Sequence, residues 1–394
     1  MIKLSISFQK IYVLLMYILA TPIVLIIRLI RPIVLIRIGA LWSSRIGHFA
    51  MNTELYLCKR DVNLYAHRSY NIFYHMYPIC NLQLKKMWNR TLFVTNFARY
   101  VDRVNCWIPG GKSNQLYWEA AADRDIHGLL STVKPHLIFT SEEKEFGKTE
   151  LQKMGISDKT SFVCFFVRDE NYLKTILPAY DWSFHSYRNG NIHNYIPALE
   201  YLISHNYILF RMGTHVKDPL PIIHPQMIDY SQKYRTDFLD IYLPSKCHFF
   251  IGDTSGIFAV FNVFRRPIVW VNYVPLEYAP SWGPNHIFIP KKLWLRQESR
   301  FLTFKEIIES GIGRFCLSQD YEKHGIDVIE NTPEEIMSVV VEMDERLKGT
   351  WKTTSEDEDL QERFWYFFKF SKLNGVITAR IGTDFLRQNQ TLLG

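Results

Sequence analysis

Residues 246–256 read KCHFFIGDTSG, an apolar run that stops at a turn bounded by two glycines. The run from His248 to Ile251 has the length and composition of a strand buried in a parallel sheet. Ile257 to Phe264 then read as the first turns of a helix. In such a unit, free backbone N–H groups and the positive end of the helix dipole point at one spot. The sequence therefore predicts an anion-binding site at this turn.

Five residues form the predicted anion-binding turn: Gly252, Asp253, Thr254, Ser255 and Gly256. Its glycines let a phosphate group approach the backbone closely, and its two hydroxyl groups add hydrogen-bond donors. The same residue types also suit an ordinary helix N-cap. Taken alone, the turn leaves both interpretations open.

Two other predicted strands end in an arginine. The apolar run from Phe162 to Val167 is followed by Arg168, and the run from Tyr207 to Phe210 is followed by Arg211. Because parallel strands end at the same edge of a sheet, both guanidinium groups are expected beside the turn, where they match a diphosphate in charge and donor geometry. Structural pairing of Arg168 with a carboxylate is the alternative. The other residues expected to contact a phosphorylated substrate are Asp169, Arg188, Asn189, Gly213 and Asp237.

The first half of the chain contains a similar unit. Pro32 to Ile38 read as a buried strand, and a helical pattern follows from Phe49 to Tyr56. Open α/β sheets bind ligands just past such a strand end, and a histidine there is suited to general-base catalysis. A helix-start histidine with a satisfied hydrogen bond is the alternative interpretation. The candidates here are the bases His48 and Glu54, in that order, and the substrate contacts Arg45 and Asn52.

Shorter elements complete this half. Val62 to Tyr65, Leu92 to Asn96 and Leu137 to Phe139 read as strands, and Leu82 to Asn89 read as a helix. The aromatic residues from Tyr70 to Tyr77 are expected to line a loop. Alternating strands and helices are typical of βαβ units with a parallel sheet.

The N-terminal region is strongly apolar. Ile11 to Ile27 carry no charged residue, with Lys10 before them and Arg28 and Arg31 after them. As a helix this run would be roughly 25 Å long, against a bilayer core of about 30 Å. A membrane-anchoring helix, a buried core helix and a signal peptide remain three interpretations. The basic flanks favour the anchor and would keep the rest of the chain cytoplasmic, because they meet anionic headgroups.

Composition narrows the class of protein. The chain has 394 residues, of which 47% are hydrophobic and 22% charged, so we expect a folded protein of two domains. The net charge of +7 is spread along the chain, which favours a membrane surface or an anionic ligand over nucleic acid. Its 6 cysteines form no C-x-x-C pair, so the spacing supports neither a structural zinc site nor a disulfide framework.

Several short motifs occur in a fixed order along the chain: Arg45-Ile46-Gly47-His48, Phe166-Val167-Arg168-Asp169, Tyr187-Arg188-Asn189, Arg211-Met212-Gly213, Phe249 to Gly256, Ile289-Pro290-Lys291-Lys292 and Asn331-Thr332-Pro333-Glu334. With this series the chain resembles a bacterial family of GT-B-type glycosyltransferases from surface-polysaccharide and lipopolysaccharide gene clusters. The resemblance implies sugar transfer from a nucleotide-sugar donor, with no cofactor and no obligatory metal.

The expected fold is α/β, with two Rossmann-like domains facing across a cleft and a membrane-associated N-terminal helix. We expect the helix in residues 1–31, an acceptor domain in 32–150, a nucleotide-sugar domain in 151–350, and helices that cross back to the first domain in 351–394. The expected activity is transfer to a saccharide or lipid-linked saccharide acceptor at the cytoplasmic face of the inner membrane. A nucleotide-sugar epimerase and a catalytically silent, membrane-tethered binding protein remain alternatives.

Overall fold

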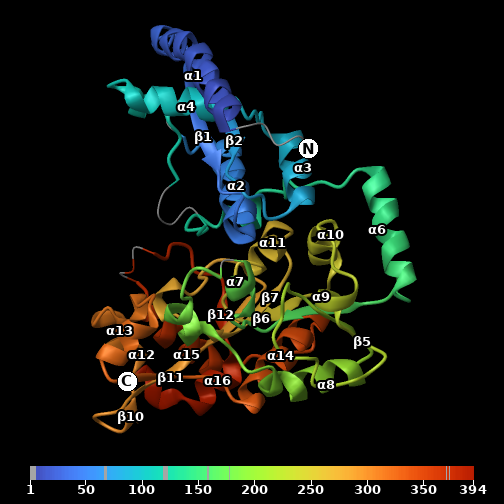
Figure 1. Cartoon of the computed structure of the whole chain (residues 1–394). Coiled ribbons are helices and arrows are strands. Elements are labelled where there is room, and N and C mark those ends of the chain that lie inside the picture. Colours follow the sequence, from blue (N-terminus) through green and yellow to red (C-terminus); the bar gives the residue numbers. More distant parts are fainter. Residues whose placement is uncertain are drawn as a thin grey trace. The chain divides into compact units, whose positions relative to one another are not determined.

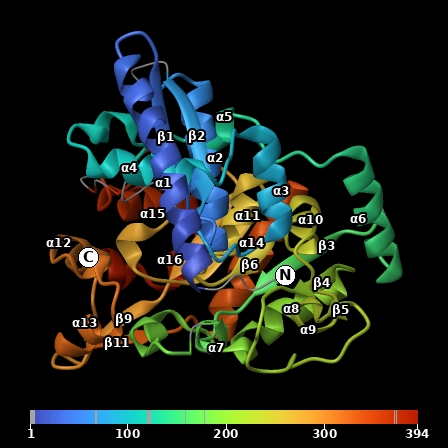
Figure 2. The same cartoon turned by 45° about the horizontal axis from the view of Figure 1, so that its top comes forward.

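The computed structural model describes residues 6–65, 69–118, 123–157, 159–176, 178–369, 371 and 373–394. The chain is a mixed α/β protein with parallel sheets and an apolar N-terminal helix (Figures 1 and 2). Its contacts divide it into two compact units. The first comprises Met1–Asp123 and His136–Ile138, and the second comprises Arg124–Pro135 and Phe139–Gly394. The predicted domain limits, and the crossing of residues 351–394 back to the first domain, stay predictions.

The first unit is built on a short parallel sheet. Strands β1 (Leu35–Leu41) and β2 (Ser69–His75) pair in parallel, with Leu35 opposite Ser69. Single bridges extend the sheet on both sides, from Ile38 to Gln115 and from Phe73 to Val94. The helices of this unit are α1 (Ile6–Leu29), α2 (Ile46–Asp61), α3 (Leu82–Thr91) and α4 (Ala98–Trp107).

Three sequence predictions for this unit are wrong. Leu137 to Phe139 form no strand, and Leu92 to Asn96 contribute only the single bridge at Val94, because no neighbouring strand pairs with the rest of either segment. Val62 to Tyr65 form no strand, because α2 continues to Asp61 and the chain then turns. Burial of Leu55 to Cys58 against the rest of the unit explains why the helix extends beyond its predicted end. The strand is instead β2, in the aromatic segment predicted as a loop, where pairing with β1 outweighs the irregular pattern of polar residues.

Helix α1 has one covered face and one exposed face. Ala20, Val24 and Ile27 are buried against Ala98, Val101 and other apolar residues of α4, and Figure 1 shows the two helices side by side. By length and composition alone, residues 8–29 could cross a membrane as a helix. Only 17% of the most apolar 18-residue stretch of this helix is buried within the protein. The exposed residues of α1 are Phe8, Ile11, Tyr12, Leu14, Leu15, Ile18, Leu19, Ile23, Leu25, Ile26 and Leu29.

Arg28, one of the basic residues that flank the apolar run, is half-buried and is held by backbone carbonyl groups of the protein. Its guanidinium group donates to the carbonyl oxygens of Asn105, Ile108 and Pro109 at 2.7–2.8 Å. These carbonyls lie at the C-terminal end of α4, where a cation is favoured by the helix dipole. Arg28 therefore fixes α1 on α4, and the expectation that it meets lipid headgroups is not supported.

The second unit is organised around a parallel sheet of 7 strands, in the order β12-β8-β7-β6-β3-β4-β5. The chain enters at β3, runs outward through β4 and β5, and returns to the other side of β3 to continue with β6, β7 and β8. This order is that of a doubly wound sheet, and ligands of such open sheets generally bind at the reversal point, here between β3 and β6. The strands are β3 (Phe162–Phe166), β4 (Ile208–Arg211), β5 (Met227–Ile228), β6 (Phe250–Gly252), β7 (Ile268–Tyr273), β8 (His286–Pro290) and β12 (Arg380–Ile381).

Helices lie on both faces of this sheet. In Figure 1, α10 and α11 lie on one side of β6 and β7, and α8 and α14 lie on the other. A separate antiparallel sheet contains β9 (Lys292–Leu295), β10 (Arg300–Phe301) and β11 (Ile326–Ile329). The helices of the unit are α5 (Leu129–Thr132), α6 (Ser141–Lys153), α7 (Asn171–Ile176), α8 (Ile196–Ser204), α9 (Tyr230–Lys233), α10 (Leu239–Lys246), α11 (Phe258–Val263), α12 (Phe304–Glu309), α13 (Ser318–Lys323), α14 (Pro333–Lys348), α15 (Ser355–Tyr366) and α16 (Thr383–Gln388).

Candidate functional site

The edge of the large sheet brings β3 and β6 together at the reversal point. Phe166 and Gly252, the last residues of these strands, are paired. A Cβ atom at Gly252 would lie 2.7 Å from the carbonyl oxygen of Phe166, so only glycine fits this close approach. Beyond the strands, the backbone N–H of Arg168 donates to Asp253 Oδ2 at 2.8 Å. The two strand ends are thus held together as one loop region.

Asp253 anchors this region from inside the protein. Its side chain is fully buried, and Oδ1 accepts hydrogen bonds from the hydroxyl of Tyr195 and from Asn272 Nδ2. Burial raises the pKa of Asp253 to about 6, although these donors and the Arg168 backbone act to lower it. With its oxygens engaged by protein donors, Asp253 orients the turn, and we assign it a positioning role.

Three cationic side chains converge around the turn. Arg168 Nη1 donates to Asn189 Oδ1 at 3.0 Å, and Lys291 Nζ donates to the backbone oxygen of Asn189 at 2.6 Å. Arg188 Nη2 donates to the carbonyl oxygen of Thr254 at 2.8 Å, which joins this arginine directly to the predicted turn. Arg168 and Lys291 are buried and Arg188 is half-buried. Residues 188–189 therefore link the turn to the ends of β3 and β8.

These cations lack carboxylate partners. Within the described residues, none of Arg168, Arg188 and Lys291 forms an ion pair with an aspartate or glutamate. Burial and the neighbouring charge of Arg188 lower the pKa of Arg168 to about 10. Burial likewise lowers the pKa of Lys291, and the charge of Arg168 adds to that effect. Asp253 acts to raise the pKa of both Arg168 and Lys291, and Glu330 acts to raise that of Lys291, although neither carboxylate forms an ion pair with these side chains. Because the cations are close together and largely buried, this cluster is suited to binding an anion.

The turn itself adds a further polar group. Thr254 is buried, and its hydroxyl donates to the carbonyl oxygen of Val274 at 3.3 Å, so it is used structurally. Ser255 Oγ is buried and has no hydrogen-bond partner in the described part of the chain. Helix α11 begins only at Phe258 and spans 6 residues, so the turn precedes the helix instead of forming its first residues. An anion bound at this turn would therefore contact side chains more than the positive end of a helix dipole.

Other predicted residues lie outside the cation cluster. Arg211 is buried, but its Nη1 lies 3.7 Å from Asp229 Oδ2, and the acidic residues around it oppose the lowering of its pKa by burial. Asp169 accepts hydrogen bonds from the backbone of Asn171 and Lys217 and so holds two loops. Of the remaining two predicted residues, Gly213 has a positive φ of 130° in the turn after β4, and Asp237 lies 3.9 Å from Arg235 before α10. The structure therefore brings Arg168 and Arg188 to the turn, and pairs Arg211 elsewhere.

Lys291 is the cluster member that the sequence analysis did not select. It directly follows β8, just as Arg168 follows β3, and the same reasoning from an apolar run that ends in a basic residue applies to it. The motif Ile289-Pro290-Lys291-Lys292, which contains it, was the sequence feature that could have identified it.

In the first unit, the predicted residues gather around the start of α2. Arg45 is exposed at the N-cap position, and His48 is half-buried with its ring 4.9 Å from that of Trp42. His48 Nδ1 lies 3.4 Å from Asn52 Oδ1. Asn52 also lines a small pocket with aromatic and basic side chains, namely Arg37, Tyr56, Lys59, Tyr65, Tyr117 and Trp118.

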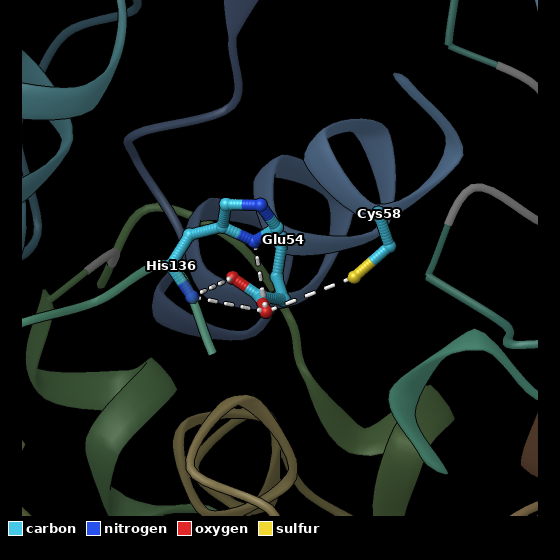
Figure 3. A group of neighbouring side chains, drawn as sticks. All are labelled: Glu54, Cys58 and His136. Carbon is cyan, nitrogen blue, oxygen red and sulfur yellow. Dashed lines mark hydrogen bonds and ion pairs between the residues drawn. The ribbon is translucent and has the colours of Figure 1, made fainter. Parts of the chain in front are cut away.

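Glu54 has a different environment from His48. It is fully buried, and its carboxylate lies 3.2 Å from His136 Nδ1 and 3.8 Å from Cys58 Sγ. Figure 3 shows both side chains in contact with this carboxylate. His136 Nε2 in turn contacts Asp61 Oδ2 at 2.9 Å. Burial acts to lower the pKa of His136, but the two carboxylates outweigh it and raise that pKa. Of the two candidate bases, only His48 therefore has a side chain that is partly accessible to solvent.

No family model and no curated protein matches this chain. Among solved structures, it is similar to the ADP-heptose lipopolysaccharide heptosyltransferase II of E. coli, with a TM-score of 0.37, 15% identity, and coverage of 64% of this chain and 90% of that chain. A family 9 glycosyl transferase from Veillonella parvula gives a TM-score of 0.44, 12% identity, and coverage of 79% and 96%. The iron-containing dodecameric glycosyltransferase TibC of E. coli gives a TM-score of 0.36 and 11% identity, with coverage of 65% of this chain and 66% of that chain. Likenesses at these scores do not establish the activity of this chain.

Proposed function

We propose that this protein is a membrane-attached glycosyltransferase of the GT-B type, which moves a sugar from a nucleotide-sugar donor to a saccharide or lipid-linked saccharide acceptor in surface-polysaccharide synthesis. The observation that carries the proposal is the cluster of Arg168, Arg188 and Lys291 at the reversal point of a doubly wound sheet. The three cations have no carboxylate partner among the described residues. A diphosphate matches this cluster in charge, and guanidinium and ammonium groups are the donors that phosphate oxygens prefer.

The cluster also suits the chemistry of the leaving group. When the bond between the sugar and the diphosphate breaks, the electron pair stays with the diphosphate, whose negative charge increases. Buried cations held in place by Asn189 and by the backbone of Thr254 stabilise that charge without reorganising. This stabilisation supports transfer without a bound metal, which stays part of the proposal.

We place the acceptor on the first unit, with His48 as the base. In an inverting transfer, a base takes the proton of the acceptor hydroxyl as its oxygen attacks the anomeric carbon. A half-buried imidazole past the end of β1 fits that role, and the aromatic pocket beside Asn52 offers rings on which a sugar packs. The exposed apolar face of α1 supports attachment to the cytoplasmic face of the inner membrane, where a lipid-linked acceptor is available.

The proposal is tested by nucleotide binding and by turnover of the full chain in detergent. The melting temperature is first measured in the presence of UDP, GDP, dTDP or CMP. Nucleotide-sugars that contain the stabilising nucleotide are then incubated with the protein and saccharide acceptors. We expect one nucleotide class to raise the melting temperature and a sugar–acceptor product to form. Conversion of free nucleotide-sugar without acceptor would instead favour an epimerase, and binding without turnover would favour a silent binding protein.

The role of His48 is tested separately. His48→Ala is expected to retain the nucleotide-induced stabilisation and to lose product formation, because the base acts on the acceptor and not on the donor. Arg60→Ala, an exposed change near the other end of α2, is the comparison variant for nonspecific damage to that helix. Full activity of His48→Ala would overturn the assignment of the base.

A further inference from the structure

The cluster of Glu54, Cys58 and His136 combines side chains that are distant in sequence. Glu54 and Cys58 lie one helical turn apart on α2, so they project from the same face. His136 comes from the segment His136–Ile138, which returns to the first unit after a passage through the second. Figure 3 shows the imidazole and the thiol approaching the same carboxylate. Each contributes a different ligand type: nitrogen, sulfur and oxygen.

The spacing of these atoms fits a metal ion. One ligand atom from each of the three residues lies within 4.8 Å of the others. His136 Nδ1 lies 3.2 Å and Cys58 Sγ lies 3.8 Å from Glu54 Oε1. Ligand atoms around a tetrahedral zinc ion are roughly 3.3–3.7 Å apart, given bonds of about 2.0–2.3 Å. His136 Nδ1 is buried and close to Oε1, yet it is not aligned for a hydrogen bond with any described residue.

The surroundings of His136 match those of a metal-bound histidine. Its second nitrogen, Nε2, contacts Asp61 Oδ2 at 2.9 Å. Metal-ligating histidines usually donate their other N–H group to a carboxylate, which fixes the ring and leaves the first nitrogen free to bind. The backbone N–H of His136 also donates to both oxygens of Glu54 at 3.3–3.4 Å, which orients that carboxylate.

We propose that Glu54, Cys58 and His136 form a zinc site in the first unit. Mixed nitrogen, sulfur and oxygen ligands are those that zinc prefers, and three protein ligands leave a fourth position for water. On binding, the thiol of Cys58 releases its proton to solvent, and so does Nδ1 of His136 when the ring is protonated. The thiolate, the carboxylate and the deprotonated Nδ1 then bind through lone pairs. The ion joins α2 to the returning segment 136–138. This site is independent of the proposed sugar transfer. The alternative explanation of the same side chains is a metal-free set of ion pairs, in which His136 bridges Glu54 and Asp61.

The test is titration of the full chain, stripped of metal by a chelator, with Co²⁺ and then with Zn²⁺. We expect one equivalent of Co²⁺ to give the visible bands of a tetrahedral ion and a near-ultraviolet band of thiolate-to-cobalt charge transfer, both removed by Zn²⁺. Zn²⁺ is also expected to raise the melting temperature. A folded wild-type chain that shows no such bands would overturn the proposal and leave the metal-free set of ion pairs.

Variants assign the ligands. Cys58→Ser is expected to abolish the charge-transfer band, and Cys316→Ser, an exposed cysteine of the second unit, is expected to retain it. Asp61→Asn keeps all three ligands and is expected to weaken Zn²⁺ binding by about 10–100-fold. If Cys58→Ser does not fold, the Asp61→Asn titration decides instead. A charge-transfer band that survives Cys58→Ser, or unchanged affinity in Asp61→Asn, would contradict the assigned site.

Discussion

The two units differ in the groups that folding leaves incompletely satisfied. In the first unit these are apolar side chains, because one face of α1 is covered by α4 and the other is exposed. In the second unit they are the charges of Arg168, Arg188 and Lys291, which form no ion pair with a described carboxylate. Apolar surface is stabilised by hydrocarbon, and buried cations are stabilised by an anion. In the proposed function, these two kinds of group correspond to a separate ligand class for each unit, a lipid surface for one and a phosphorylated compound for the other.

The largest effect is expected from Arg168→Ala, which tests the charged half of this contrast. Loss of a buried guanidinium from an anion site costs about 2–4 kcal/mol of binding free energy, which corresponds to roughly 30–1000-fold in affinity. Isothermal titration calorimetry with the nucleotide that stabilises the wild type measures this change. Arg296→Ala, a half-exposed arginine paired with Asp327, is the matched control and should bind normally.

The outcome of this pair also tests the contrast between the units. Equal affinity of Arg168→Ala and the wild type would mean that the cation cluster is not the anion site. Equal losses in Arg168→Ala and Arg296→Ala would mean that overall charge, and not the arrangement at the sheet edge, determines binding.

The sequence predicted much of the second unit because its signals are local. An apolar run, a glycine-bounded turn and a following basic residue identified the ends of β3 and β6, together with Arg168 and the turn. The same reasoning failed to separate Arg168 from Arg211, because the neutralising Asp229 follows a different strand, β5. Whether a cation keeps its charge available depends on which strands become neighbours, and a sequence pattern does not show this order.

The sequence also did not predict the long-range contacts of the first unit, because a local pattern does not show which distant segments become neighbours. Strand β2 exists because its backbone pairs with β1, although its polar and aromatic residues read as a loop. The cluster of Glu54 and His136 joins residues that are 82 positions apart in the chain, so no spacing motif marks it. The apolar character of α1 was visible in the sequence, but the packing of one face on α4 was not.

A smaller effect is expected from Asp253→Asn, through the pH dependence of stability. The folded-state pKa of Asp253, about 6, lies above its ordinary value of 3.8, so the folded protein holds the proton more tightly than the unfolded chain. The stability that Asp253 contributes is therefore highest below pH 3.8 and falls as pH rises to about 6. Urea unfolding should show the free energy of the wild type, relative to Asp253→Asn, falling by about 1–3 kcal/mol between pH 4 and pH 7.

This measurement tests whether the nearby cations neutralise Asp253. Other carboxylates, such as Asp240, titrate in both proteins, so their effects cancel in the difference. Parallel pH curves for the two proteins would mean that Lys291 and Arg168 compensate fully for the burial of Asp253. Their charges would then be committed to the protein, and the second unit would no longer differ from the first in the proposed way.

The smallest effect is expected for single substitutions on α1, where the two faces give opposite results. Leu15 is 50% exposed, so Leu15→Ala should leave the melting temperature unchanged and weaken partition into phospholipid vesicles by about 1 kcal/mol. Val24 is 1% exposed against α4, so Val24→Ala should lower stability by about 1 kcal/mol and leave partition unchanged. Vesicle flotation and thermal unfolding of both variants measure the two quantities. Equal loss of partition in both would mean that α1 separates from α4 at the membrane and inserts as a single helix, because lipid would then contact both faces.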